Sequence, residues 1–396
     1  MTFLASSIRK LAIPAFLASL TFSSAQAADA NAVAERLKEV MAGQGMDIAW
    51  TSVSGSADEV VLEGTTLKVA GAEETVPIGA VTLAGVTDKG GGYRVDKVTL
   101  PAYAMSEGDI AVDVAGAEIK GLTLPAPGAT DPLASIMLYE AADLSAVSLK
   151  QAGKPLFSLS NLHVEITPPA NGSALTFQAA AEKLSADLSS VGDPQAKKVI
   201  QALGYETLNG TVKMAGSWQP TDGRLGLTQY DISIDDAGTL GLGFDLGGYT
   251  PDFIKALQDI QKKMAAQPEG ADNSAQGLAM LGLMQQLTFH SAKIRFDDAS
   301  LTGKILAYIA GQQGAQPADI VNQAKALLPF ALAQLNDPEL SKQVTEAVGS
   351  FLDEPKSLEI RAAPPSPLPF AVVAAGAMAA PKDLPKTLGV TVTANQ

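Results

Sequence analysis

Alternating hydrophobic and polar positions dominate the middle of the chain and predict β-strands. The alternation is clearest over residues 208–218, 224–234 and 239–246. Side chains of a strand point in turn to its two faces, so regular alternation indicates a strand with one buried face. The connectors 221–223 and 235–238 are rich in Asp and Gly, which favour tight turns. This spacing of strands and short turns predicts an antiparallel meander.

Shorter apolar or alternating runs extend this pattern toward both ends of the chain. Residues 175–188 are ambiguous because they are rich in Ala, but the alternation of Ser185 and Asp187 with apolar neighbours favours a strand. The run 88–92 contains three Gly residues and favours a hairpin turn. The other predicted strands are 48–51, 60–62, 66–69, 76–86, 93–100, 110–115, 119–124, 144–149, 156–166, 287–296, 358–362 and 388–393.

Helical spacing replaces alternation after Gly248. Phe253, Leu257, Ile260 and Met264 recur every three or four residues, so a helix beginning near residue 251 would carry them as one apolar stripe. The chain is therefore predicted to have an α+β fold, mostly an antiparallel β-meander, with amphipathic helices concentrated in the C-terminal half. The other predicted helices are 29–41, 131–142, 194–203, 278–286, 301–310, 317–335, 338–352 and a short Ala-rich helix between the last two strands.

The first 27 residues have the organisation of a secretory signal peptide. Two positive residues precede a short apolar stretch, 11–22, and Ala25 and Ala27 are small residues at the positions that a signal peptidase reads. We expect cleavage after Ala27 and a periplasmic location. The alternative is a membrane anchor. However, residues 11–22 and the apolar run 370–380 are too short to cross about 30 Å of hydrocarbon as helices, so no stable transmembrane anchor is expected.

Two parts are predicted beyond the signal peptide at 1–27. Residues 28–128 form a β-rich part, which ends where Pro125 and Pro127 interrupt the strand series. Residues 129–396 form a part that mixes strands and helices. The pattern leaves open whether these are separate domains or share one continuous sheet.

Composition excludes several kinds of chemistry. The 396 residues include no Cys and two His, and the formal net charge is −14. The lack of Cys excludes disulfides, thiolate zinc sites, iron–sulfur clusters and a cysteine nucleophile. The acidic balance argues against nucleic acid as a partner and against adsorption to an anionic membrane surface. A hydrophobic fraction of 46% is typical of a chain that folds around a core.

The two histidines are the remaining candidates for acid–base catalysis. Strand parity places His163 on the polar face that also carries Glu165, so it is expected to be exposed. Parity places His290 on the face of Ile294 and Phe296, as a core or sheet-edge residue. The sequence contains no Gly-x-Ser-x-Gly elbow, phosphate-binding loop or His-Glu-x-x-His motif. A hydrolase that uses His163 is therefore only the third hypothesis.

Metal and cofactor sites are not predicted either. The pairs Asp235–Asp236 and Asp297–Asp298 offer too few alternating oxygen ligands for a dedicated calcium loop, and turn capping is the favoured interpretation. The Gly-rich run 238–243 alternates with Leu, as in a strand, whereas a dinucleotide-binding loop leaves a strand and enters a helix.

The strongest functional signal is the apolar face of the long strands. Leu240, Leu242 and Phe244 lie on one face of their predicted strand, opposite Gly241 and Gly243. An open apolar face of this kind would hold a lipid acyl chain. The alternative is that helices cover the face and form an ordinary two-layer core. The residues predicted to line an open surface are Leu240, Leu242, Phe244, Phe253, Leu257, Met280 and Met284.

Two resemblances accompany this pattern. The strand series 45–124 and 203–246 resemble the repeats of AsmA-like envelope proteins of bacteria. The run Lys-Ile-Arg-Phe-Asp-Asp-Ala-Ser-Leu at 293–301, the run at 351–358 and the Pro-rich ending resemble exported alphaproteobacterial proteins of unknown function. AsmA-like proteins carry a membrane anchor, which this chain is expected to lose, and no catalytic residue carries over from either resemblance.

The leading hypothesis is a non-enzymatic periplasmic protein of the cell envelope that binds or shields lipid or another apolar ligand. The alternative is a structural or protein-interaction factor of the envelope that uses a sheet edge or helix face and has no ligand.

Overall fold

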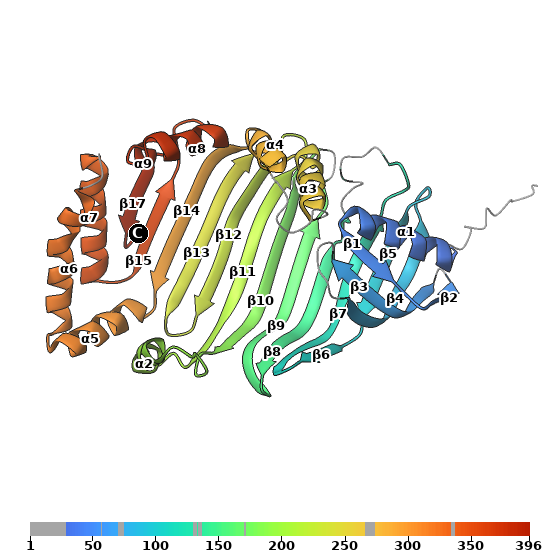
Figure 1. Cartoon of the computed structure of the whole chain (residues 1–396), viewed down its shortest axis with the longest axis horizontal. Helices are drawn as coiled ribbons and strands as arrows, with labels where there is room; N and C mark the ends of the chain where they lie inside the picture. Colours follow the sequence, from blue (N-terminus) through green and yellow to red (C-terminus); the bar gives the residue numbers. More distant parts are fainter. Residues whose placement is uncertain are drawn as a thin grey trace, which may run out of the picture.

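A computed structural model describes residues 29–56, 58–69, 75–129, 133, 137–169, 172–265, 274–333 and 337–396. These residues form a single, mostly antiparallel sheet of 17 strands with helices at its ends and along its edges (Figure 1). The prediction of an α+β fold with a β-meander, and with helices concentrated in the C-terminal half, is confirmed. The predicted signal peptide lies outside the described residues.

Most strands pair with the next strand along the chain, so the sheet is a long meander. The first strands are β1 (Met46–Ala49), β2 (Ser52–Ser56), β3 (Glu59–Val69), β4 (Val76–Asp88), β5 (Tyr93–Leu100), β6 (Tyr103–Glu107), β7 (Ile110–Leu124), β8 (Ala141–Gln151) and β9 (Lys154–Thr167). The others are β10 (Leu175–Asp187), β11 (Thr207–Gln219), β12 (Arg224–Ile234), β13 (Gly238–Gly247), β14 (Thr288–Asp298), β15 (Ser357–Ala362), β16 (Leu368–Pro369) and β17 (Val390–Ala394).

The meander passes without interruption from the N-terminal part to the C-terminal part. β7 pairs with β8 from the register Ile110↔Gln151 to Lys120↔Ala141. The boundary proposed near residue 128 therefore lies between two hydrogen-bonded neighbours of one sheet.

The helices are α1 (Ala30–Gly43), α2 (Pro194–Leu203), α3 (Pro251–Ala265), α4 (Ser274–Met284), α5 (Leu301–Gln313), α6 (Pro317–Leu332), α7 (Pro338–Asp353), α8 (Phe370–Ala379) and α9 (Leu384–Thr387).

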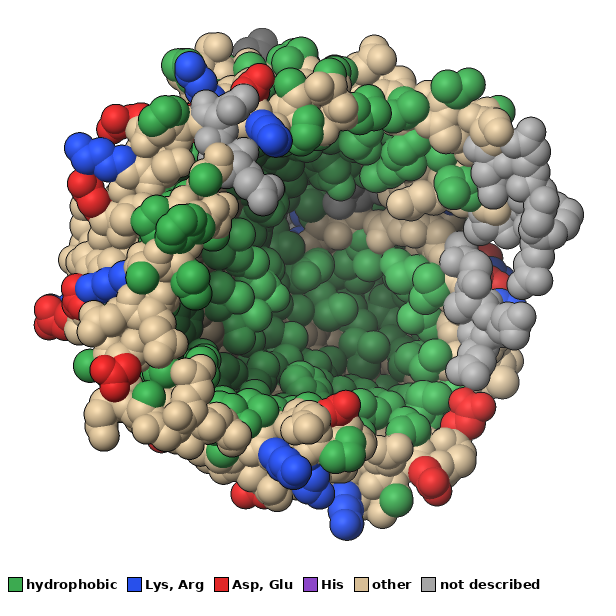
Figure 2. All heavy atoms as spheres, turned by 60° about the vertical axis from the view of Figure 1, so that its left-hand side comes forward, with side chains coloured by type: hydrophobic (Ala, Val, Ile, Leu, Met, Phe, Trp, Pro, Cys, Tyr) green, Lys and Arg blue, Asp and Glu red, His purple; other side chains and the backbone are tan. Residues whose placement is uncertain are grey.

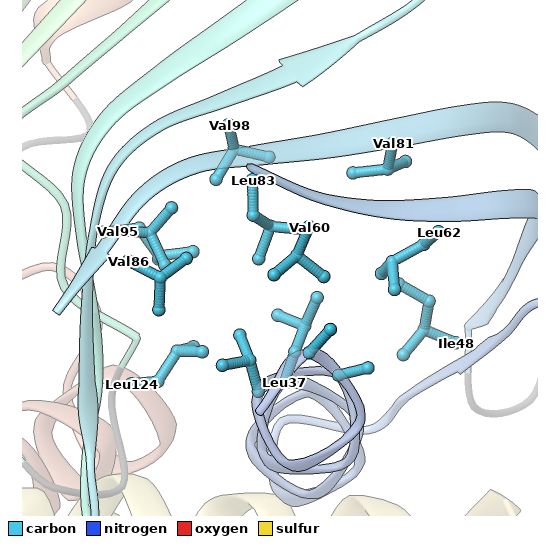
Figure 3. Packing of buried hydrophobic residues seen from close by; sticks show 14 residues of the cluster. Leu37, Ile48, Val60, Leu62, Val81, Leu83, Val86, Val95, Val98 and Leu124 are labelled. Carbon is cyan, nitrogen blue, oxygen red and sulfur yellow. The ribbon is translucent and has the colours of Figure 1, made fainter. Parts of the chain in front are cut away.

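Helix α1 covers the sheet at its N-terminal end and completes the main core. Its side chains Val33, Ala34 and Leu37 are buried against β3, β4 and β5 (Figure 3). Val60 and Leu83 of the sheet are fully buried beneath it. The helix forms because these apolar residues recur at helical spacing, and the Asp29 side chain caps it by accepting a hydrogen bond from the Asn31 amide at 3.0 Å.

Helix α7 covers the same face at the C-terminal end. Leu340 and Ala347 pack on Val392, with Leu358 beside them. The start of α7 has Pro338 in its first turn and Asp337 as its cap, where the Asp337 side chain accepts a hydrogen bond from the Leu340 amide at 3.0 Å. One face of the sheet is thus closed by a helix at each end.

Several sequence predictions were wrong. A helix was predicted over 131–142, but β8 begins at Ala141 and Leu138 bridges to Thr123; residues 130–132 and 134–136 lie outside the described part of the chain. Two short strands at 110–115 and 119–124 are one long strand, β7. Strands 60–62 and 66–69 likewise form one strand, β3.

Candidate functional site

The sheet carries continuous apolar rows that run across its strands on one face, which we call the inner face. Each row follows the pairing of neighbouring strands, so its members come from distant parts of the sequence. The longest row takes one residue from each of β5, β7–β15 and β17, and every residue in it is apolar. Its members are Leu100, Ala117, Leu144, Leu162, Ala181, Val212, Ile232, Leu240, Phe296, Leu358 and Ala394.

Neighbouring rows on the inner face have the same character. One continues the core under α1 toward the middle of the sheet, through Val60, Leu83, Val98, Ile119, Ala142, Val164, Ala179, Met214 and Tyr230. Another comprises Ile166, Phe177, Gly216, Leu227, Phe244, Ala292, Ala362 and Val390. The inner face is therefore apolar in two dimensions, along the strands and across them.

The middle of the inner face is open. Leu240, Ile294 and Ile360 lie on neighbouring strands and are 40%, 51% and 45% exposed. Figure 2 shows a deep hollow lined by hydrophobic side chains, with charged side chains around its opening. We call this open part of the inner face, between α1 and α7, the trough. The interpretation that helices cover the whole apolar face was wrong, because α1 and α7 cover only its two ends.

The outer face of the same strands is polar and charged. The register that pairs the apolar residues also aligns Glu118, Asp143, His163, Ala180, Lys213, Asp231, Gly241, Arg295, Glu359 and Thr393. Opposite charges meet there, as in Lys120–Asp143 at 3.1 Å and Arg295–Glu359 at 3.6 Å. The outer face is thus suited to water, and the apolar character of the trough is not a general property of the sheet.

The predicted lining residues divide into two groups. Leu240, Leu242 and Phe244 lie on the inner face of β13, which pairs with β12 and β14. Phe253 does not line the trough: it is 1% exposed and packs with Leu283 and Leu287 in a closed cluster between α3, α4 and β14. Its position on an apolar helical stripe could not distinguish a core residue from a lining residue.

The other three predicted residues belong to the same helical region. Leu257 and Met284 pack against the cluster around Phe253 and are half-buried. Met280 is half-buried on α4. Most of the trough is instead formed by residues of β8–β12 that the sequence reading did not single out, such as Leu162 and Ile232. Only the strand register, which brings them into one row, reveals their role.

His163 lies on the exposed outer face, as predicted, within a cluster of charges. Its Nδ1 is 2.6 Å from Oδ1 of Asp143, and its Nε2 is 3.3 Å from Oε1 of Glu165. The hydrogen bond to Asp143, followed by that to Glu165, raises the pKa of His163 above its usual 6.5. Hydrogen bonds from His163 and Lys120 lower the pKa of Asp143. Both ring nitrogens face carboxylates, so neither is directed at a nucleophile as a catalytic triad requires.

His290 lies on the outer face, and its predicted place with Ile294 and Phe296 was wrong. The register of β14 against β13 shifts between the pairs Asp245↔Ser291 and Leu246↔Phe289. This irregularity inserts one residue and reverses the alternation. The His290 ring therefore stands beside Thr288, with its Nε2 3.3 Å from the Thr288 hydroxyl, away from the trough.

The paired aspartates shape turns and helix starts. Asp298 accepts a hydrogen bond from the Thr302 amide at 2.8 Å at the start of α5, and Asp297 forms an ion pair with Arg295 at 2.8 Å. Asp236 occupies a turn with φ of 55°.

Among the described residues, no three His, Asp or Glu side chains are grouped as a metal site would need. None of the described helices is long and apolar enough to span a membrane.

Comparison with known proteins adds a match but no activity. A family model described as an uncharacterized protein matches residues 231–395, from within β12 to the last strand, which is under half of the chain. No curated protein matches the chain. The matched description names neither a source nor a function, so the resemblances to exported alphaproteobacterial proteins and to AsmA-like proteins stay predictions.

Proposed function

We propose that the protein is a non-enzymatic component of the cell envelope that holds lipid acyl chains, or a similarly long apolar ligand, in the trough. The observation that carries this proposal is the exposure of large apolar side chains on the inner face of β13, β14 and β15, where Leu240, Ile294 and Ile360 adjoin. Surfaces of soluble proteins seldom leave such a continuous apolar area uncovered unless it binds something. An acyl chain would gain the free energy of leaving water along the whole row.

The shape and chemistry of the trough favour an elongated, uncharged ligand portion. The apolar rows run across many strands and carry no charged side chain, with the Tyr230 hydroxyl as one polar group among them, so they offer mainly dispersion contacts. Charged side chains surround the opening of the hollow (Figure 2), where a polar headgroup could remain in water. This arrangement suits a lipid whose chains lie in the trough while its headgroup stays outside.

The periplasm is the proposed location, on the strength of residues 1–27 in the sequence. A catalytic role is not part of the proposal. His163 is separated from the trough by the thickness of the sheet, and its neighbours Asp143 and Glu165 hold it in an ion cluster.

Pairing of a sheet edge with another protein is less well supported. The outward amide of Val392 on the edge strand β17 donates to the Gln343 side chain of α7 at 3.1 Å. This contact removes a hydrogen-bond donor that an added strand would need, which is a common way to protect an edge.

Matched substitutions on the two faces test the proposal. Leu240→Gln/Ile294→Gln/Ile360→Gln places polar groups in the trough, and Thr239→Gln/Lys293→Gln/Glu359→Gln changes the adjacent outer-face residues of the same strands. We expect the inner variant to lower the affinity for a fluorescent fatty-acyl probe about tenfold or more, because polar side chains must be desolvated by the chain. The outer variant should bind nearly as the wild type does.

Native mass spectrometry of protein extracted gently from its own envelope provides a second readout. A lipid mass should accompany the wild type and the outer variant, and it should be depleted in the inner variant. Reproducible absence of lipid, together with no uptake of the probe by the wild type, would contradict the proposed function.

A further inference from the structure

Two short helices at one edge of the sheet are mostly apolar and carry no charge. The sequences of α4 (SAQGLAMLGLM) and α8 (FAVVAAGAMA) contain no Asp, Glu, Lys or Arg. The two helices lie beside each other, with α3, along the edge where β13 ends and β14 begins (Figure 1). A helix that is apolar all round is normally buried in a core or in lipid.

These helices are instead exposed. Leu278 and Leu281 of α4 are 69% and 61% exposed, and Met378 of α8 is 83% exposed. None of the ten residues of α8 is buried, although α4 buries Leu283 against the cluster around Phe253. The result is an apolar ridge, which we call the rim, formed by the outward side chains Leu278, Leu281, Val372 and Met378.

We propose that the rim inserts into the surface of a phospholipid bilayer. A protein partner or a second copy would be expected to meet an apolar patch with a polar surround, whereas Ser274 and Gln276 are the only polar side chains of the two helices. Apolar helices of ten or eleven residues are too short to span a membrane, and their length suits either a buried core helix or a segment in the membrane interface. The exposure of Leu278, Leu281 and Met378 favours the interface. The occupant that matches both properties is lipid.

Lysines lie close to the rim helices in the sequence and the fold. Helix α3, which packs on α4, ends in Lys262 and Lys263, and Lys382 follows α8. The Lys262 ammonium donates to the Gly43 carbonyl of α1 at 3.4 Å, which leaves Lys263 and Lys382 as the candidates for contact with headgroups. Lysine side chains can reach from an apolar surface to phosphates while their methylene groups stay in the apolar layer. These lysines stand out in a chain whose net charge is −14.

The rim is continuous with the trough. At this edge Leu225, Leu246, Phe289 and Leu368 form an inner-face row. The ring of Phe289 contacts that of Phe370, the first residue of α8, edge-on at 6.4 Å between centroids. An acyl chain that leaves a bilayer at the rim would therefore meet apolar side chains along its way into the trough. This path rests on the proposed function, whereas bilayer attachment by the rim does not.

Vesicle flotation tests the attachment directly. The mature chain from Ala28 is mixed with vesicles of phosphatidylethanolamine and phosphatidylglycerol, so that the apolar residues 11–22 do not contribute. We expect the wild type to float with the vesicles. Leu278→Gln/Leu281→Gln/Val372→Gln/Met378→Gln should lower its partition coefficient about tenfold or more, since four apolar side chains no longer enter the bilayer.

A control with equally exposed apolar residues is available on α6. Leu327 and Phe330 are 66% and 77% exposed on a helix that packs on α5 and α7. Leu327→Gln/Phe330→Gln should float like the wild type. The milder variant Leu278→Gln/Met378→Gln, which changes only two outward residues, should lose part of the binding if the fourfold variant does not fold.

The outcomes separate this inference from the proposed function. The rim variant should still bind the acyl probe, and the trough variant Leu240→Gln/Ile294→Gln/Ile360→Gln should still float. A wild type that does not float, or a rim variant that floats equally well, would overturn the inference. A third outcome would also overturn it: the wild type self-associates, and the rim variant floats equally well but no longer self-associates. The rim would then be an interface between two copies.

Discussion

His163 stands between two carboxylates on the outer face of the sheet, and its surroundings define a testable electrostatic property. The hydrogen bonds to Asp143 and Glu165 raise the pKa of the imidazole, and the ring in turn lowers the pKa of Asp143. The hydrogen bond from Gln178, followed by that from His163, lowers the pKa of Glu165. The ring is 47% exposed, so solvent screening keeps the stabilisation of the folded state small, under about 1 kcal/mol. At the residue scale the cluster is a surface ion network.

The raised pKa of His163 determines how its contribution to the free energy of unfolding changes with pH. While Asp143 and Glu165 are ionised, the contribution of protonated His163 to the free energy of unfolding is complete below the unfolded-state pKa of His, about 6.5. It is lost as the pH rises through the higher folded-state pKa. In an NMR titration, we expect His163 to titrate above 6.5, and Asp143→Asn to lower that pKa. The chain has only one other His, so His163→Gln assigns the signal. A His163 pKa that is at or below 6.5, or that Asp143→Asn leaves unchanged, would contradict the described hydrogen bonds.

Residue-level prediction succeeded for His163 and failed for His290 for one physical reason. Parity counting assumes an unbroken period of two, which holds through β9 around His163. In β14 the irregular register near His290 reverses the period. No composition signal near His290 announces that irregularity, since neither Gly nor Pro interrupts residues 288–296.

At the scale of elements, the long strands bend at positions that resemble turns. Gly64 lies within β3 with φ of 59°, and Gly121 lies within β7 with φ of 66°. Glycine adopts this left-handed conformation without a steric penalty, so a strand can kink and continue. The prediction divided β3 around Gly64, a residue type that also favours turns, but it divided β7 at residues 116–118 and not at the kink at Gly121. Strands without such kinks, such as β5 and β12, were predicted with their observed bounds.

Contact between strands also explains why particular glycines are needed. Gly216 of β11 pairs with Phe177 of β10, whose ring lies over it on the inner face. A Cβ at Gly216 would collide with that ring and with the backbone carbonyl of Gly226. At Gly226 a Cβ would meet only the Ser217 hydroxyl, at 3.7 Å.

These two glycines form a matched pair for a stability measurement. We expect Gly216→Ala to lower the free energy of unfolding by about 1–3 kcal/mol, because the ring of Phe177 must move or the strands must separate. Gly226→Ala should be neutral or stabilising by up to about 1 kcal/mol, because Ala restricts the unfolded chain. Urea unfolding monitored by circular dichroism compares the two variants. Equal effects of the two substitutions would mean that the Phe177–Gly216 contact does not stabilise the sheet.

At the scale of the molecule, the sheet is a long, one-sided surface whose apolar face is closed by α1 and α7 at its ends and left open between them. Alternation along each strand predicted that one face would be apolar. It could not predict whether helices would cover that face, because covered and open faces have the same pattern. The placement of α3, α4 and α8 at the edge of the sheet leaves the middle uncovered.

The central claim is that lipid acyl chains occupy the trough, and photo-crosslinking in cells tests it most directly. A photoreactive phenylalanine analogue replaces Ile294, which faces the trough at 51% exposure, or the adjacent Lys293, which faces outward. After irradiation, mass spectrometry of the purified protein should detect lipid adducts at position 294 and not at position 293. Equal adducts at the two positions, or none at position 294, would contradict the claim.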